Sequence, residues 1–136
     1  MSNKQLPKLP YMIGEVYGQA MSDVAHVVHE SCVDAGWYTD LRNGEPLERN
    51  VPEMLCLIHS EISEALEGYR KDLKDDHLPH LDAIDVELAD AVIRIFDLCG
   101  YLGIDIGHVI DEKFAYNVER ADHKIENRMK KGGKKI

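Results

Sequence analysis

The chain has 136 residues, of which 44% are hydrophobic and 30% charged, as is usual for one globular domain with a sizeable core. Its formal net charge of −9 argues against general nucleic-acid binding, which needs an excess of Lys and Arg. The three cysteines have neither disulfide-framework nor Cys-x-x-Cys spacing, no apolar run is long enough to span a membrane, and the N-terminus lacks a signal pattern. We therefore expect a cytoplasmic protein with reduced thiols and neither nucleic-acid nor membrane partners.

The first third of the chain predicts one helix between two irregular segments. Residues 1–16 contain Pro7 and Pro10 and indicate an irregular lead-in. Helical periodicity then covers about residues 17–35, and Gly36 is a suitable stop. The polar connection that follows contains turn-forming residues, so we predict no regular structure before residue 50.

Three further helices are predicted, at about residues 51–70, 82–101 and 105–123. Asn50 is a suitable cap for the first of them, and Pro52 suits its first turn. The acidic stretch after it fails the EF-hand pattern and is interpreted as a solvated loop. With no convincing strand, the sequence predicts a single all-α domain with a four-helix-bundle-like core, ending in a basic tail at residues 124–136.

Two pairs of acids stand out, Glu61-Ile62-Ser63-Glu64 and Glu87-Leu88-Ala89-Asp90. Acids three residues apart leave the same side of a helix, and both pairs flank the apolar face of their helix in the same way. Four clustered carboxylates repel one another unless a cation lies between them, and a hard divalent cation prefers oxygen ligands. The pattern predicts a Mg²⁺ site facing a phosphate, although a solvated charged face is the ordinary interpretation of one such pair.

The last predicted helix has a stripe that changes character along its length. It begins with apolar residues, and the cationic or polar Lys113, Asn117, Arg120 and Lys124 continue it at nearly the same helical angle. This indicates a helix that leaves the core beside an anionic ligand. The alternative interpretation is that the apolar stems of these Lys and Arg side chains simply cover the end of a helix bundle.

These residues resemble the MazG-like family of all-α nucleotide pyrophosphohydrolases, in particular its short single-domain type. The family signature is Glu-x-x-Glu, a spacer, then Glu-x-x-Asp, and it is often followed by Lys, Asn and Arg on the next helix. Glu61, Glu64, Glu87 and Asp90 match the signature, and Lys113, Asn117 and Arg120 match the later pattern. The resemblance covers about residue 52 to the end.

The resemblance implies a house-cleaning hydrolase that cleaves nucleoside triphosphates between the α and β phosphates. The four signature acids would bind Mg²⁺, for which Mn²⁺ can substitute, and would be catalytic together with Lys113. Lys113, Asn117 and Arg120 would contact the substrate, and Glu64 is our candidate for orienting the attacking water. The family resemblance also implies a homodimer or homotetramer.

Base recognition is the least constrained feature. Trp37 could stack on a base, although a lone Trp more often packs structurally, and His29 is a polar candidate for a base edge. The preferred nucleotide stays open. Two rival interpretations also remain: a non-catalytic helical interaction module with an acidic face, and a narrow-range relative acting on dUTP.

Overall fold

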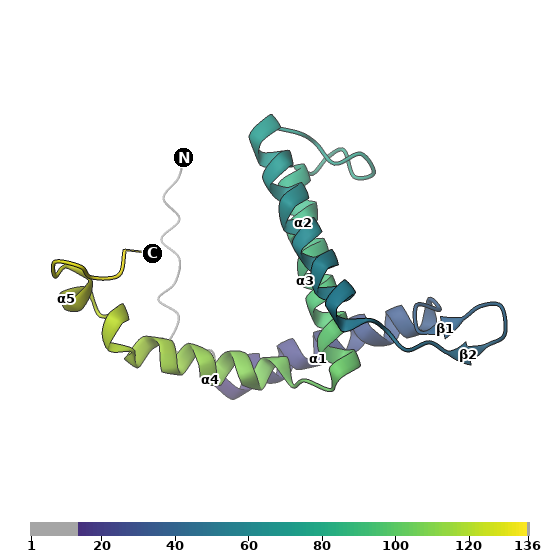
Figure 1. Ribbon diagram of the computed structural model, residues 1–136, viewed down its shortest axis with the longest axis horizontal. Helices are drawn as coiled ribbons and strands as arrows, with labels where there is room; N and C mark the ends of the chain where they lie inside the picture. The colour runs from purple at the N-terminus through teal and green to yellow at the C-terminus, as the bar shows by residue number, and fades with distance from the viewer. Residues whose placement is uncertain (1–13, 136) are drawn as a thin grey trace. The chain divides into compact units, whose positions relative to one another are not determined.

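The computed structural model describes residues 14–135, and the chain divides into two compact units. One unit contains residues 23–104, and the other contains residues 14–22 together with 105–135. The predicted all-α character is confirmed, because most of the described residues are helical (Figure 1). The helices are α1 (Gly14–Asp34), α2 (Val51–Lys71), α3 (Ala83–Leu102), α4 (Ile106–Glu119), the short 3₁₀ helix η1 (Ala121–His123) and α5 (Ile125–Arg128).

Helix α1 starts earlier than predicted and ends close to the predicted stop. It begins at Gly14, so part of the expected irregular lead-in is helical, and the rest of that lead-in lies outside the described residues. At the other end, Gly36 adopts a φ of 86°, which glycine tolerates without strain. The Gly36 and Trp37 amides donate to the carbonyls of Val33 and Cys32, and these bonds satisfy the last turn of the helix.

A small hairpin follows α1, where the sequence predicts irregular structure. Strands β1 (Thr39–Asp40) and β2 (Glu45–Pro46) pair in antiparallel register. Gly44 between them has a φ of 78°, which permits the tight reversal. Each strand has only two residues, too few for an alternating pattern to be visible in the sequence.

Helix α2 begins where its cap predicts. The Asn50 side chain accepts a hydrogen bond of 3.1 Å from the Glu53 amide, and Pro52 lies in the first turn, where its missing N–H costs nothing. The helix ends at Asp72, which has a left-handed φ of 52°. The loop from there to α3 reverses the chain so that α2 and α3 run side by side (Figure 1).

The two helices make their close approach through small residues. The buried positions include Ala65 and Gly68 on α2 and Ala83 and Ala91 on α3. A Cβ atom added at Gly68 would lie only 2.9 Å from the Cβ of Ala83. Because no large side chain separates the helices along this line, groups on the same stripe are brought close together.

Several large apolar residues on the predicted apolar faces of α2 and α3 are exposed. Ile62, Leu66 and Tyr69 of α2 are exposed, as are Leu88 and Ile95 of α3. Glu61, predicted at the edge of the apolar face, is instead buried with 7% of its surface exposed. The small-residue stripe is the one that meets the neighbouring helix, so the larger side chains beside it stay uncovered.

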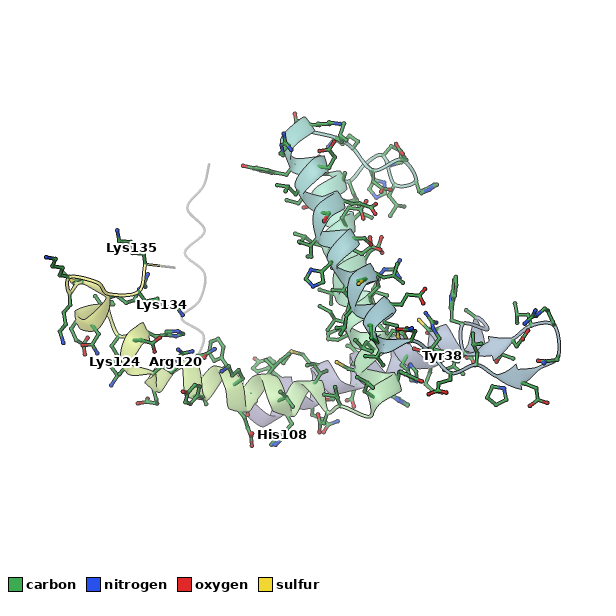
Figure 2. The ribbon with its side chains drawn as sticks, viewed as in Figure 1. Tyr38, His108, Arg120, Lys124, Lys134 and Lys135 are labelled. Atoms are coloured by element: carbon green, nitrogen blue, oxygen red, sulfur yellow. The ribbon has the colours of Figure 1, made fainter. Side chains whose placement is uncertain are left out.

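Helix α4 is shorter than predicted. It ends at Glu119, and Arg120 is extended, with φ −60° and ψ 127°. The Arg120 guanidinium binds the Asp122 carboxylate through two contacts, from Nε at 2.9 Å and from Nη2 at 2.8 Å. Residues two apart do not face each other on a helix, so this pair requires the helix to stop. The predicted continuous stripe through Arg120 and Lys124 is therefore broken, and both lie beyond the end of α4 (Figure 2).

The basic tail is partly ordered into α5 and a turn. The Arg128 side chain donates to the carbonyl groups of Lys134 and Lys135, which returns the end of the described chain onto α5 (Figure 2). In the same unit, α1 and α4 meet at two buried glycines, Gly18 and Gly107. None of the helices within residues 14–135 is long and apolar enough to cross a membrane.

Candidate metal centre

Helices α2 and α3 and the loop between them surround a cavity of about 750 Å³. All four signature acids line it, namely Glu61, Glu64, Glu87 and Asp90. The two pairs come from facing helices, which the close approach through small residues holds together. The spacing in the sequence puts both acids of a pair on one side of their helix. The close packing of α2 and α3 then brings the two pairs together.

Three of these acids form a tight group. Glu61, Glu87 and Asp90 each offer an oxygen atom, and these oxygens lie within 4.8 Å of one another. Oxygens bound to one Mg²⁺ ion lie about 3.0 Å apart when adjacent and at most about 4.2 Å apart when opposite, so the three carboxylates would move closer together on binding one ion. The donors are all oxygens, which fits Mg²⁺ or Mn²⁺ better than a softer metal. Glu64 is outside the group, although it lines the same cavity.

The group is electrostatically strained without a cation. The pKa of Glu87 is raised to about 7, first by burial, then by a hydrogen bond with Glu61, and then by the negative charges of its acidic neighbours. A raised pKa of this kind means that a proton is partly filling the role of a positive charge. A divalent cation would replace that proton, so the donor set and its electrostatics fit a metal ion.

One protein cation already contacts the group. Arg94, one turn beyond Asp90 on α3, donates from Nε to Oε1 of Glu61 at 2.5 Å. Glu61 is thus held between a carboxyl group and a guanidinium, which accounts for its burial without an unpaired charge. Both the Arg94 guanidinium and the hydrogen bond with Glu87 therefore stabilise a negative charge on Glu61.

A second cavity, of about 430 Å³, adjoins the first through the shared lining residues Glu61, Asp90 and Arg94. Trp37 lines it, with 63% of the residue exposed. Because so much of the residue is exposed, Trp37 does not pack into the core of the described chain. Trp37 is therefore brought close to the acidic group by the fold.

His29 contributes to this second cavity indirectly. Its Nδ1 lies 2.9 Å from Oδ1 of Asp97, which lines the cavity, and the Tyr38 hydroxyl donates to the same oxygen at 2.9 Å (Tyr38 is labelled in Figure 2). Burial and this hydrogen bond raise the pKa of Tyr38 above its usual range, so the hydroxyl stays a donor. The close approach of Gly100 to His29 leaves no room for a larger residue between α3 and α1. His29 thus fixes Asp97 in place.

The other predicted substrate-binding residues belong to the unit of residues 14–22 and 105–135. Lys113 is exposed, and its Nζ lies 4.8 Å from the centre of the Tyr116 ring. The Arg120 guanidinium lies 5.8 Å from the same ring and pairs with Asp122. Asn117 is half-buried. Contact of these three residues with the substrate stays a prediction.

The lining residues that were not selected as site residues from the sequence include Arg94, Asp97, Lys74 and His77. Arg94 and Asp97 follow the signature on the same helical flank, and this i+4 and i+7 spacing from Asp90 is a signal that could have found them. Lys74 and His77 line the first cavity from the α2–α3 loop, which was interpreted only as solvated. Nothing in the sequence of that loop shows that it turns back toward the acids.

Comparisons with protein-family models, with curated proteins and with solved structures found no match for this chain. The resemblance to MazG-like enzymes therefore stands on the signature residues described above.

Proposed function

We propose that this protein is a Mg²⁺-dependent nucleoside triphosphate pyrophosphohydrolase, which releases a nucleoside monophosphate and pyrophosphate. The observation that carries the proposal is the convergence of Glu61, Glu87 and Asp90 in one cavity, with their oxygens within 4.8 Å of one another. These are three of the four residues that match the family signature. The raised pKa of Glu87 supports the proposal, because it indicates that a cation bound here would be stabilised by the clustered carboxylates.

In the proposed reaction, water attacks a phosphorus atom of the substrate and the bridging P–O bond between the α and β phosphates breaks. Glu61, Glu87 and Asp90 would hold one or more Mg²⁺ ions, which supply charge neutralisation and activation of water when bound. Glu64 lines the cavity outside this group, so its carboxylate is our candidate to orient the water and take its proton. Lys113 and Arg120 would balance charge on the phosphates, and Asn117 would hydrogen-bond to phosphate or sugar.

The second cavity is where we propose that the nucleoside part of the substrate binds. It is contiguous with the acidic group, and its lining includes the exposed Trp37 indole, whose face is suited to stacking on a base. Asp97, fixed by His29 and Tyr38, would accept a hydrogen bond from a base or sugar. The substrate class is therefore a nucleotide with its triphosphate over the acids and its nucleoside toward Trp37.

We further propose that the chain acts as a homodimer or homotetramer. Exposed large apolar side chains lie on α2 and α3, among them Ile62, Leu66, Leu88 and Val92. Large apolar side chains that stay exposed in a single chain are often covered by a protein partner. The mass of the protein in solution, measured by light scattering coupled to size exclusion, tests this: a monomer at micromolar concentration would contradict it.

The reaction class is tested by incubating the purified protein with the eight common ribo- and deoxyribonucleoside triphosphates, with and without Mg²⁺, and identifying products by mass. The expected result is monophosphate plus pyrophosphate, formed only with the metal. Diphosphate plus orthophosphate would show that a different bond is cleaved. Absence of turnover, with no rise in melting temperature on adding Mg²⁺, would favour the non-catalytic interaction module, and turnover of dUTP alone would favour the narrow-range relative.

A further inference from the structure

Arg94 occupies a boundary position in the site. It lines both the 750 Å³ cavity that contains the acids and the 430 Å³ cavity that contains Trp37. Its Nε atom donates to Oε1 of Glu61 at 2.5 Å, from α3 across to α2. The side chain thus lies at the point where a triphosphate over the acids would join its nucleoside.

The two partners of this ion pair differ in exposure. The Glu61 side chain is 9% exposed, whereas that of Arg94 is 42% exposed. Water already solvates part of the Arg94 guanidinium, whereas the buried Glu61 carboxylate needs a positive partner at all times. Only Nε takes part in the bond to Glu61, and a guanidinium carries five N–H donors in a planar fork. Arg94 can therefore leave Glu61 once another cation takes its place, and it still has N–H donors that Glu61 does not use.

A metal ion and Arg94 would use the same carboxylate. Glu61 belongs to the group of three acids whose oxygens lie within 4.8 Å of one another, and its Oε1 is the atom that Arg94 contacts. A cation with two charges outcompetes a partly solvated guanidinium for that carboxylate. Once displaced, the guanidinium would lie between two cavities beside an anionic substrate, and Arg binds phosphate oxygens in a two-pronged manner.

We propose that Arg94 is a further phosphate-binding cation of this site, held on Glu61 until a divalent metal takes that carboxylate and then transferred to the substrate's phosphates. The inference rests on the proposed function and adds to it a residue outside the four-acid signature. It also assigns an order of events, in which the metal binds first and prepares the phosphate contact. The alternative is a purely structural ion pair that pins α2 to α3.

Two binding measurements on the full chain separate these roles. The first is the affinity of the nucleotide-free protein for Mn²⁺, measured by calorimetry. Arg94→Ala should bind Mn²⁺ about threefold to tenfold more tightly than the wild type, because Glu61 no longer has a competing cation. Arg42→Ala is the matched control: it removes one positive charge from an exposed pair with Asp40, and its Mn²⁺ affinity should stay at the wild-type value.

The second measurement is the affinity for the α,β-methylene analogue of the best substrate from the nucleotide panel, with Mn²⁺ saturating. Arg94→Ala should bind this analogue at least about tenfold more weakly, Arg94→Lys should recover part of the loss, and Arg42→Ala should match the wild type. Circular dichroism checks the fold of each variant. If Arg94→Ala does not fold, Arg94→Gln, which keeps the size and polarity of the side chain, is used for both measurements.

The outcomes distinguish the inference from the proposed function. If the wild type turns over no nucleotide and binds no Mn²⁺, both are overturned. If the wild type binds both ligands and the neutral variant keeps wild-type affinity for the analogue, only the role of Arg94 is overturned, whatever its Mn²⁺ affinity. Unchanged or weaker Mn²⁺ binding by that variant would likewise exclude competition for Glu61 and leave a structural pin.

Discussion

Glu87 of α3 and Glu61 of α2 share a hydrogen bond between their carboxyl groups, and this contact is one of the causes that raise the pKa of Glu87 to about 7. Two carboxyl groups at hydrogen-bonding distance repel each other unless a proton or a cation lies between them. The contact therefore links the stability of the metal-free protein, the uptake of metal and the pH.

The metal-free protein should lose stability as the pH rises from about 4.5 to about 7. The pKa of Glu87 is higher in the folded state than the ordinary glutamate value of 4.5, so in this range Glu87 binds more protons in the folded state than in the unfolded state. Unfolding then releases up to about one proton from this residue, and each rise in pH favours the unfolded state. Thermal unfolding of the wild type and of Glu87→Gln across this range measures the effect: the difference in melting temperature should grow with pH in favour of the variant. Parallel curves would contradict the shared proton.

Metal binding should release protons in the same pH range. Mg²⁺ requires the ionised form of Glu87, so binding at pH 6 should displace close to one proton, whereas binding at pH 8 should displace almost none. Calorimetry in two buffers with different ionisation enthalpies gives the number of protons released. Glu87→Gln should show no pH-dependent release, and an equal release at both pH values would indicate that another group titrates.

The close approach of α2 and α3 should be sensitive to one methyl group. Gly68→Ala places a Cβ 2.9 Å from the Cβ of Ala83, nearer than packed atoms allow, and the backbone amide of Ile84 lies close by. The clash should outweigh the gain of about 1 kcal/mol that Ala usually brings to a helix, so the variant should be less stable than the wild type.

A double-mutant cycle with Ala83→Gly tests that explanation. Removing the facing methyl group opens the space, so Gly68→Ala/Ala83→Gly should be more stable than the sum of the two single effects predicts. Urea unfolding of the four proteins gives the coupling free energy, expected at about 1 kcal/mol or more. A coupling near zero would mean that the helices do not meet at these two residues.

Local signals in the sequence predicted the helix boundaries well where a cap was visible. Helix α2 was predicted at 51–70 and spans Val51–Lys71, because local features determine its start: the Asn50 side chain accepts from the Glu53 amide, and Pro52 suits the first turn. Helix α4 was overextended, since its end depends on the pairing of Arg120 with Asp122, which helical periodicity does not report.

The site was predictable only to the extent that it follows helical spacing. Glu61 and Glu64 share a flank by geometry, but a helical wheel cannot tell which flank the neighbouring helix covers. The small residues that let α2 and α3 pack closely lie on the same side as the acids. Glu61 is therefore buried, and Leu66 is exposed. The pairing of Arg94 with Glu61 joins residues 33 apart, and only the fold of α2 onto α3 reveals it.

The role of the three-acid group in catalysis can be tested by exchanging one charge at matched positions. Asp90→Asn removes one negative charge from the group and replaces a carboxylate oxygen by an NH₂ group, and it should lower turnover by at least about 100-fold, because the metal is expected to supply several kcal/mol of stabilisation to the transition state. Glu67→Gln removes the same charge from α2 in the lining of the same cavity, outside the group, and should keep turnover within about threefold of the wild type. Steady-state hydrolysis of the best substrate at saturating Mg²⁺ measures both variants. Equal losses would show that the cavity needs negative charge in general, and a fully active Asp90→Asn protein would remove Asp90 from the metal centre.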